Sequence, residues 1–276
     1  MMTYATLMVH LQLGASNANL LKVASDLAQR FQANVVGIAA CEPTQMVYGD
    51  GYISGDIVEQ SRAEIAAQMK LAEAEFKSTI GAHFERSAWR SIVMYGSLSA
   101  YLVAEARCAD LFVTSIAASE YFDASRAADT GDIIMKLGRP VLVVPPNAAS
   151  PVLKRVVVAW NDAREARRPI CDALPLLKTV TSVTVVEIAT AAELATARSR
   201  LHDVTEWLGR HGASAQSVAA VSAGEHAAQL HAIAQEHHAD LIVAGAYGHS
   251  RLREWAFGGV TRDLLLSGNC CSLLSH

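Results

Sequence analysis

The chain has 276 residues and a formal net charge of −4, and 51% of its residues are hydrophobic while 6% are aromatic. This length predicts about two domains, each able to bury a core without disulfide or metal staples. Without a basic run, non-specific nucleic-acid binding is disfavoured, because counterion release needs clustered Lys and Arg. No apolar run reaches membrane-spanning length and the N-terminus lacks the basic region of a signal peptide, so we expect no membrane partner and a cytoplasmic location.

The first half of the chain alternates short, branched-rich apolar runs with longer amphipathic segments. Strands are expected near residues 4–11, 34–40, 87–94, 110–115 and 140–145. Helices are expected near residues 15–32, 56–80, 97–108 and 126–137. Strands separated by helices indicate right-handed βαβ units and a parallel, doubly wound sheet.

A linker precedes a second half of the same kind. The stretch Pro145–Pro151 combines prolines with small polar residues, which is typical of a boundary between domains. After it, strands are expected near residues 154–160, 182–188, 215–221, 240–245 and 270–274. Helices are expected near residues 163–178, 190–211, 224–237 and 259–267. We therefore assign two domains, at residues 1–146 and 152–276.

The two halves repeat each other in sequence. Ala109–Val113 reads like Ala239–Val243, 130 residues later, and Leu7–Gln12 matches Val156–Asn161 at an offset of 149. The first half therefore holds 19 additional residues, which we place in a long loop around residues 42–56. Two copies of one α/β unit are predicted.

The most specific pattern follows the fourth strand of the second half. Gly245 and Gly248 are followed after nine residues by Gly258 and Gly259, with Thr261 just behind them. Glycines let the backbone approach an anion closely, and free N–H groups at a helix start attract negative charge. The pattern predicts a phosphate-binding loop at a strand end, where doubly wound sheets bind ligands. The alternative interpretation is ordinary loop punctuation.

This G-x2-G-x9-G spacing resembles the nucleotide loop of the universal stress protein family. The strand Val156–Asn161 and the segment Arg262–Leu265 resemble further parts of that family, and the resemblance is strong over residues 152–276 and degenerate over residues 3–146. It implies an α/β fold of two tandem, doubly wound, five-stranded parallel-sheet domains, each adenine nucleotide alpha-hydrolase-like. The two would form an intramolecular pseudo-dimer that could also assemble into a homodimer.

The last strand of each half would be an apolar edge prone to aggregation if it were left unpaired. These strands are Val141–Val144 and Cys271–Leu274. Universal stress proteins pair such edges between subunits, so the resemblance implies that the two strands pair antiparallel within this one chain. The linker would raise the effective concentration of that contact.

The resemblance also implies a set of nucleotide contacts in the second half. The phosphates would lie on Gly245, Gly248, Gly258, Gly259 and Thr261, and the adenosine end would contact Asn161 and Ile188. His249 either pairs with a phosphate or faces solvent. Gly259 stands where many ATP-binding members have Ser or Thr, and Asn161 stands where they have Asp. The expected ligand is ATP or ADP, with or without Mg²⁺, and no tightly bound metal or redox cofactor is expected.

The first half lacks the features of this loop. Gly245, Gly248, Gly258 and Thr261 correspond to Ser115, Ala118, Ala128 and Gly131. Three glycines are lost and acidic residues are gained, so we expect one nucleotide per chain, bound by the second half.

The sequence predicts a cytoplasmic stress-response protein that binds an adenine nucleotide as a regulatory or sensing module, with an unidentified protein partner. Two alternatives stay open: a slow ATP hydrolase on the same fold, and a nucleotide-free interaction scaffold. Catalysis is disfavoured because no Ser-His-Asp arrangement, nucleophile elbow or Walker loop occurs. We interpret the five cysteines as reduced thiols, and the adjacent Cys270 and Cys271 as small apolar residues.

Overall fold

The computed structural model describes most of the chain. The described residues are 3–43, 55–82, 84, 86–116, 128–148, 150–246 and 270–276. The helix expected near residues 259–267 and the loop around residues 44–54 lie outside them.

The described part of the first half contains five strands and four α-helices. The strands are β1 (Thr6–His10), β2 (Asn34–Cys41), β3 (Ser87–Val93), β4 (Leu111–Ser115) and β5 (Val141–Val144). The helices are α1 (Ala18–Phe31), α2 (Gly55–Phe76) with a π-helical end η1 (Lys77–Gly81), α3 (Leu98–Glu105) with a 3₁₀ end η2 (Ala106–Cys108), and α4 (Thr130–Leu137). All nine expected elements are confirmed, but α4 begins later than residue 126 because Asp129 caps its first turn.

The described part of the second half repeats this order. Its strands are β6 (Arg155–Trp160), β7 (Ser182–Ala189), β8 (Ala215–Val221), β9 (Leu241–Gly245) and β10 (Cys271–Ser275). Its helices are α5 (Arg164–Leu177), α6 (Leu194–Arg210) and α7 (His226–Glu236). Helix α6 begins four residues later than expected, because a turn closed by the Glu193 N–H and the Thr190 carbonyl precedes it.

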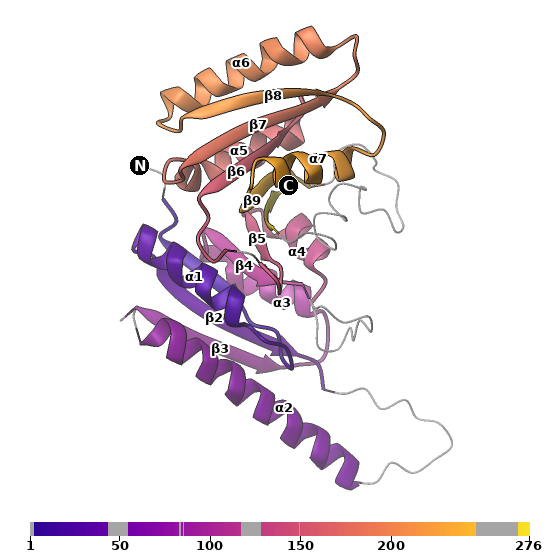
Figure 1. The fold of residues 1–276 in the computed structure, drawn as a ribbon. Coiled ribbons are helices and arrows are strands. Elements are labelled where there is room, and N and C mark those ends of the chain that lie inside the picture. Colours follow the sequence, from indigo (N-terminus) through magenta and orange to yellow (C-terminus); the bar gives the residue numbers. More distant parts are fainter. Residues whose placement is uncertain are drawn as a thin grey trace, which may run out of the picture.

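All ten strands form one sheet in the order β3-β2-β1-β4-β5-β10-β9-β6-β7-β8. Strands within each half are parallel, and the halves meet where β5 pairs antiparallel with β10. Ser272 lies opposite Val143 and Leu274 lies opposite Val141. The predicted doubly wound sheets and their antiparallel junction are confirmed, and Figure 1 shows the two halves end to end along the single sheet, with α2 and α6 at opposite ends of the molecule.

Two apolar cores cover the two faces of the sheet. Helices α1, α2, α5 and α6 bury residues such as Leu27, Phe76 and Leu177 in one core. Helices α3, α4 and α7 bury residues such as Leu102 and Ile133 in the other. Both cores draw on both halves of the chain, so the halves share their hydrophobic stabilisation.

The repeated aspartates of the two halves have a structural role. The Asp110 side chain accepts hydrogen bonds from the backbone N–H groups of Ala5 and Thr6, both at 2.9 Å. Asp240 does the same for Lys154 and Arg155, at 3.1 and 2.9 Å. Each carboxylate ties the start of a fourth strand to the start of a first strand, which explains why this part of the repeat is preserved.

Side-chain bonds reinforce the junction between the halves. The Tyr4 hydroxyl donates to the Asp172 carbonyl at 2.6 Å, and the Arg30 guanidinium donates to the Leu153 carbonyl at 3.0 Å. Arg168 of α5 reaches the Gly138 carbonyl at 3.2 Å. These bonds connect α1, α4 and α5 to the opposite half of the chain.

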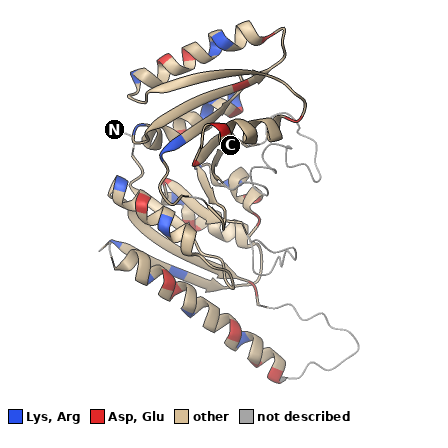
Figure 2. Ribbon diagram, viewed as in Figure 1, with Lys and Arg blue, Asp and Glu red and all other residues tan. Residues whose placement is uncertain are grey.

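Charged residues of both signs lie along each of the helices α1, α2 and α6 (Figure 2). Arg30 pairs with Asp26 and Lys77 pairs with Glu73, each four residues apart on one helix. Over the ranges given above, no helix is both long and apolar enough to cross a bilayer.

We predict that Val143→Pro disrupts the junction. Val143 is 2% exposed and lies in a strand paired on both sides, so proline would remove a ladder hydrogen bond and leave a buried partner unsatisfied, at a cost of about 1–3 kcal/mol. The expected result is loss of soluble monomeric chain, measured by size-exclusion chromatography. Val93→Pro is the control, because Val93 is the last residue of the edge strand β3. The N–H that bonds β2 at this end of the strand is that of the next residue, Met94. An equally soluble Val143→Pro protein would show that the halves hold together by another surface.

Candidate functional site

The candidate site lies at the carboxyl edge of the second half, where the winding of the sheet reverses. Strand β6 lies between β7 and β9. The chain adds β7 and β8 on one side of β6 and then crosses back to place β9 on the other side. Ligands of open α/β sheets bind at such switch points.

Three of the residues predicted from the sequence meet at this edge. Asn161 follows the last residue of β6, Ile188 is near the end of β7, and Gly245 ends β9. Asn161 and Ile188 each follow the register pair Trp160 and Glu187 by one residue. The other predicted contacts, Gly248, His249, Gly258, Gly259 and Thr261, lie outside the described residues.

Gly245 packs against the first turn of α5. A Cβ at this position would lie 2.1 Å from the Glu165 carbonyl oxygen and 2.7 Å from its carbonyl carbon. Pro169, four residues further along α5, has no N–H to bond that carbonyl. A glycine at 245 is therefore needed for close packing of strand and helix, whatever part it has in holding phosphate.

The turn after β6 presents an exposed amide beside paired charges. Asn161 is exposed, and its backbone carbonyl, not its side-chain amide, accepts a 2.6 Å hydrogen bond from the Ala163 N–H. Asp162 pairs with Arg167 of α5 at 2.9 Å, so its carboxylate is directed toward the helix. The negative charge of Asp162, which would repel a phosphate at this edge, is thus paired with the Arg167 guanidinium.

A second ion pair, which the sequence interpretation missed, lies next to this edge. Glu187 is 4% exposed, and both of its carboxylate oxygens accept hydrogen bonds from the Arg200 guanidinium. A charged residue inside the apolar run of β7 was the available signal, because a buried carboxylate requires a partner. The pair holds α6 over the end of β7.

The corresponding edge of the first half is closed by its own side chains. Gln12, the counterpart of Asn161, is 8% exposed and donates to the Ser115 carbonyl at 2.5 Å, which links the ends of β1 and β4. The Asn17 side chain accepts from the Gln12 N–H at 2.9 Å and donates to the Gln12 carbonyl at 3.0 Å. These side chains occupy the switch point where a ligand would otherwise bind.

A carboxylate likewise occupies the start of α4. Asp129 accepts hydrogen bonds from the N–H groups of Gly131 at 2.8 Å and Asp132 at 3.2 Å. The Ser99 hydroxyl accepts from the Asp129 N–H at 3.1 Å. At the offset of 130 residues, Asp129 corresponds to Gly259. The N–H groups at the start of α4 therefore face a side chain.

His10 is buried beside this closed edge. It is 4% exposed, its Nδ1 lies 3.0 Å from the Thr114 hydroxyl, and its ring stacks on Phe112. Burial lowers its pKa from 6.5 to about 4. The imidazole is therefore neutral at physiological pH.

All five cysteines are free thiols. Cys271 is 1% exposed, Cys270 is partly buried, and burial raises the pKa of both thiols, that of Cys271 to about 12. The interpretation of this adjacent pair as small apolar residues agrees with these positions, because a thiol this weakly acidic is a poor nucleophile. In the described ranges, no group of three or more His, Cys, Asp or Glu side chains could hold a metal ion.

We predict that Gly245→Ala destabilises the second half. The added methyl would meet the Glu165 backbone, so the expected loss is about 1–3 kcal/mol in the free energy of unfolding, measured by urea denaturation. Gly209→Ala in α6 is the matched control, because nothing lies within 4 Å of its added Cβ and alanine favours a helix by about 0.5–1 kcal/mol. Equal stability of the two variants would contradict the packing role of Gly245.

We predict a pH-dependent contribution from His10. Its folded pKa lies below 6.5, so the unfolded chain takes up the proton first as the pH falls. The stability it contributes is complete above pH 6.5 and is lost toward pH 4. His10→Gln should lose about 2 kcal/mol less than the unaltered chain between pH 7 and pH 5, measured by urea denaturation at each pH. Parallel losses in the two proteins would refute this.

Comparison with known proteins gives the family of the second half and the fold of the whole chain. Residues 153–274 match the model of the Universal stress protein family. A universal stress protein structure from Archaeoglobus fulgidus is 12% identical, with 98% of this chain and 95% of that chain covered and a TM-score of 0.70. A functionally unknown protein from Pseudomonas aeruginosa is 15% identical, with 99% of this chain and 92% of that chain covered and a TM-score of 0.61.

At these identities, the two likenesses show a common fold over both halves. A search of the curated proteins found no match. The family match, the two five-stranded halves and the likeness over the whole chain agree with the tandem arrangement expected from the sequence. Residues 153–274 are therefore a domain of the universal stress protein family.

Proposed function

We propose that the second half binds an adenine nucleotide, ATP or ADP, at the carboxyl edge of β6, β7 and β9, and that the protein acts as a stress-related regulatory or sensing module. One contrast carries the proposal. Asp129 fills the helix start of the first half, whereas glycine stands at the corresponding position of the second. The family match of residues 153–274 supports the same half.

In this proposal the backbone of the glycine loop holds the phosphates. Gly248, Gly258 and Gly259 supply close approach, and N–H groups near Thr261 face the anion. Asn161 is exposed at the neighbouring strand end, where its amide can donate and accept at a base or ribose. Ile188 is half-buried in the α7-side core and offers an apolar contact to the base.

The same contrast supports one nucleotide per chain. The first half uses Gln12 to bridge the ends of β1 and β4, and Asp129 to cap α4. A nucleotide would have to displace both groups and would meet the Asp129 charge. We therefore assign the first half, residues 1–146, a structural role and the binding role to residues 152–276.

We propose binding without rapid turnover. Two carboxylates near the edge, Asp162 and Glu187, are each paired with an arginine. A general base for water activation must be free to accept a proton close to its substrate. We also propose a cytoplasmic location, which the five free thiols support because reduced cysteines are typical of reducing compartments.

Calorimetry of the full chain with ATP and with ADP, each with Mg²⁺, tests the proposal. We predict a micromolar dissociation constant, about −8 kcal/mol, and one site per chain. Gly259→Asp copies the first half's carboxylate into the second and should abolish binding. Asp129→Gly is the matched control and should leave the affinity of the second half unchanged.

Each contrary outcome has a distinct meaning. No heat with either nucleotide would favour the nucleotide-free scaffold, and steady phosphate release would favour the hydrolase. Two sites per chain, or loss of binding in Asp129→Gly alone, would show that the halves are assigned the wrong way round.

A further inference from the structure

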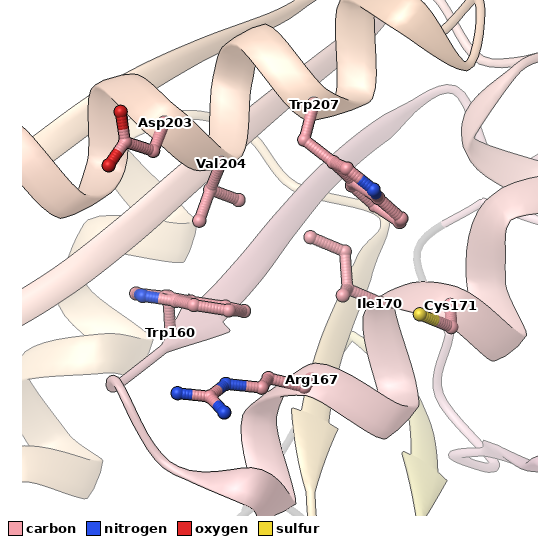
Figure 3. A pocket seen from close by; sticks show the side chains of 7 residues that line it. All are labelled: Trp160, Arg167, Ile170, Cys171, Asp203, Val204 and Trp207. Atoms are coloured by element: carbon pink, nitrogen blue, oxygen red, sulfur yellow. The ribbon is translucent and has the colours of Figure 1, made fainter.

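A cavity of about 320 Å³ lies between α5 and α6, on the sheet face opposite α7. Figure 3 shows its lining side chains, which are Trp160, Arg167, Ile170, Cys171, Asp203, Val204 and Trp207. Its volume is at the lower end of the range for small-molecule sites. Trp160 belongs to the core on this face, whereas Ile188 of the proposed nucleotide edge packs on the other, so the two sites are separate.

The inner wall of the cavity is apolar and aromatic. Ile170 and Val204 are buried, and two tryptophans, Trp160 and Trp207, are partly buried against the same core. The indole Nε1 of Trp160 is buried and has no hydrogen-bond partner in the part of the chain that the structure describes. Buried donors without a partner are uncommon.

One carboxylate that lines the cavity has no ion-pair partner among the described residues. Arg167 on the rim is matched by Asp162 at 2.9 Å, and Arg200 one turn along α6 is matched by Glu187. Asp203 lines the cavity, and no hydrogen bond or ion pair joins its side chain to the described residues. In Figure 3 its carboxylate lies on α6 above the Trp160 ring. The unmatched charge of the cavity is thus negative.

From these contacts we infer that the α5–α6 cavity binds a small organic cation, an ammonium group attached to an apolar body. Indole faces attract cations through their negative quadrupole, and two tryptophans line this cavity. The Asp203 carboxylate supplies the opposite charge. The apolar body would pack on Ile170 and Val204.

Three probes of one shape test the charge assignment: phenethylamine, 2-phenylethanol and phenylacetate. The full chain is titrated with each, and binding is followed through the ¹⁵N indole resonances of Trp160 and Trp207, with Trp89 of β3 in the other half as the internal reference. The expected order of affinity is phenethylamine, then 2-phenylethanol, then phenylacetate. Failure of all three to shift Trp160 and Trp207 would overturn the site, and a preference for phenylacetate would overturn its charge.

Two variants of α6 carry the same loss of charge. Asp203→Asn should weaken phenethylamine about threefold or more and leave 2-phenylethanol unchanged, because only the charged probe uses the carboxylate. Glu206→Gln is the control, since Glu206 is exposed on α6 and does not line the cavity. Equal effects of the two variants on phenethylamine would overturn the assignment of Asp203.

Thiol alkylation provides an independent readout in the unaltered protein. Cys171 lines the cavity and is exposed, while Cys108 is exposed in the other half. Bound phenethylamine should slow iodoacetamide labelling of Cys171 and leave that of Cys108 unchanged. If Cys171 were labelled at the same rate with and without saturating phenethylamine, the location of the site would be overturned.

Discussion

The antiparallel contact of β5 with β10 is the interaction on which the rest of the architecture depends. Both strands are buried along their whole length, and each also pairs with an inner neighbour of its own half. This contact removes two apolar edges and joins the halves into one sheet. Because the strands of each half are parallel while the halves run antiparallel, the carboxyl ends of the two halves lie on opposite edges of the sheet. Each half therefore has its own carboxyl edge, and the two edges do not meet.

The carboxyl edges of the two halves differ in their polar side chains. In the first half, Gln12, Asn17 and Asp129 satisfy the backbone groups that the switch point leaves open. Gln12 and Asn17 are buried and bond each other, and a buried polar network is stable when its members are satisfied in this way. Asp129 is exposed and bonds the first turn of α4 separately. In the second half the counterpart of Gln12 is exposed Asn161. The fold is compatible with an edge closed by side chains, because the sheet and the two apolar cores are shared by both halves and do not depend on that edge.

Helix α5 links the features of the second half. Its start is set by the contact of Gly245 with the Glu165 backbone, at the same edge where Asn161 is presented. Its first turns carry Arg167 and Ile170, which line the cavity under α6. Trp160, the residue before Asn161, is directed toward that cavity from the end of β6. The packing of one glycine thus positions both the strand-end edge and one wall of the aromatic cavity.

Hydrophobic periodicity and internal repetition were enough to predict most of the elements and the duplication of the α/β unit, whereas the pairing of β5 with β10 was implied by the family resemblance. These are local signals: branched apolar runs form buried strands, and a repeat in sequence becomes a repeat in fold. The resemblance of the glycine loop also pointed to the family of the second half. Only the tertiary structure decided what Gly245, Asp129 and Glu187 contact, because each partner is distant in sequence or depends on the exact start of a helix. The cavity between α5 and α6 had no sequence signal for the same reason: its tryptophans and its carboxylate come from a strand and a helix that meet only in the folded chain.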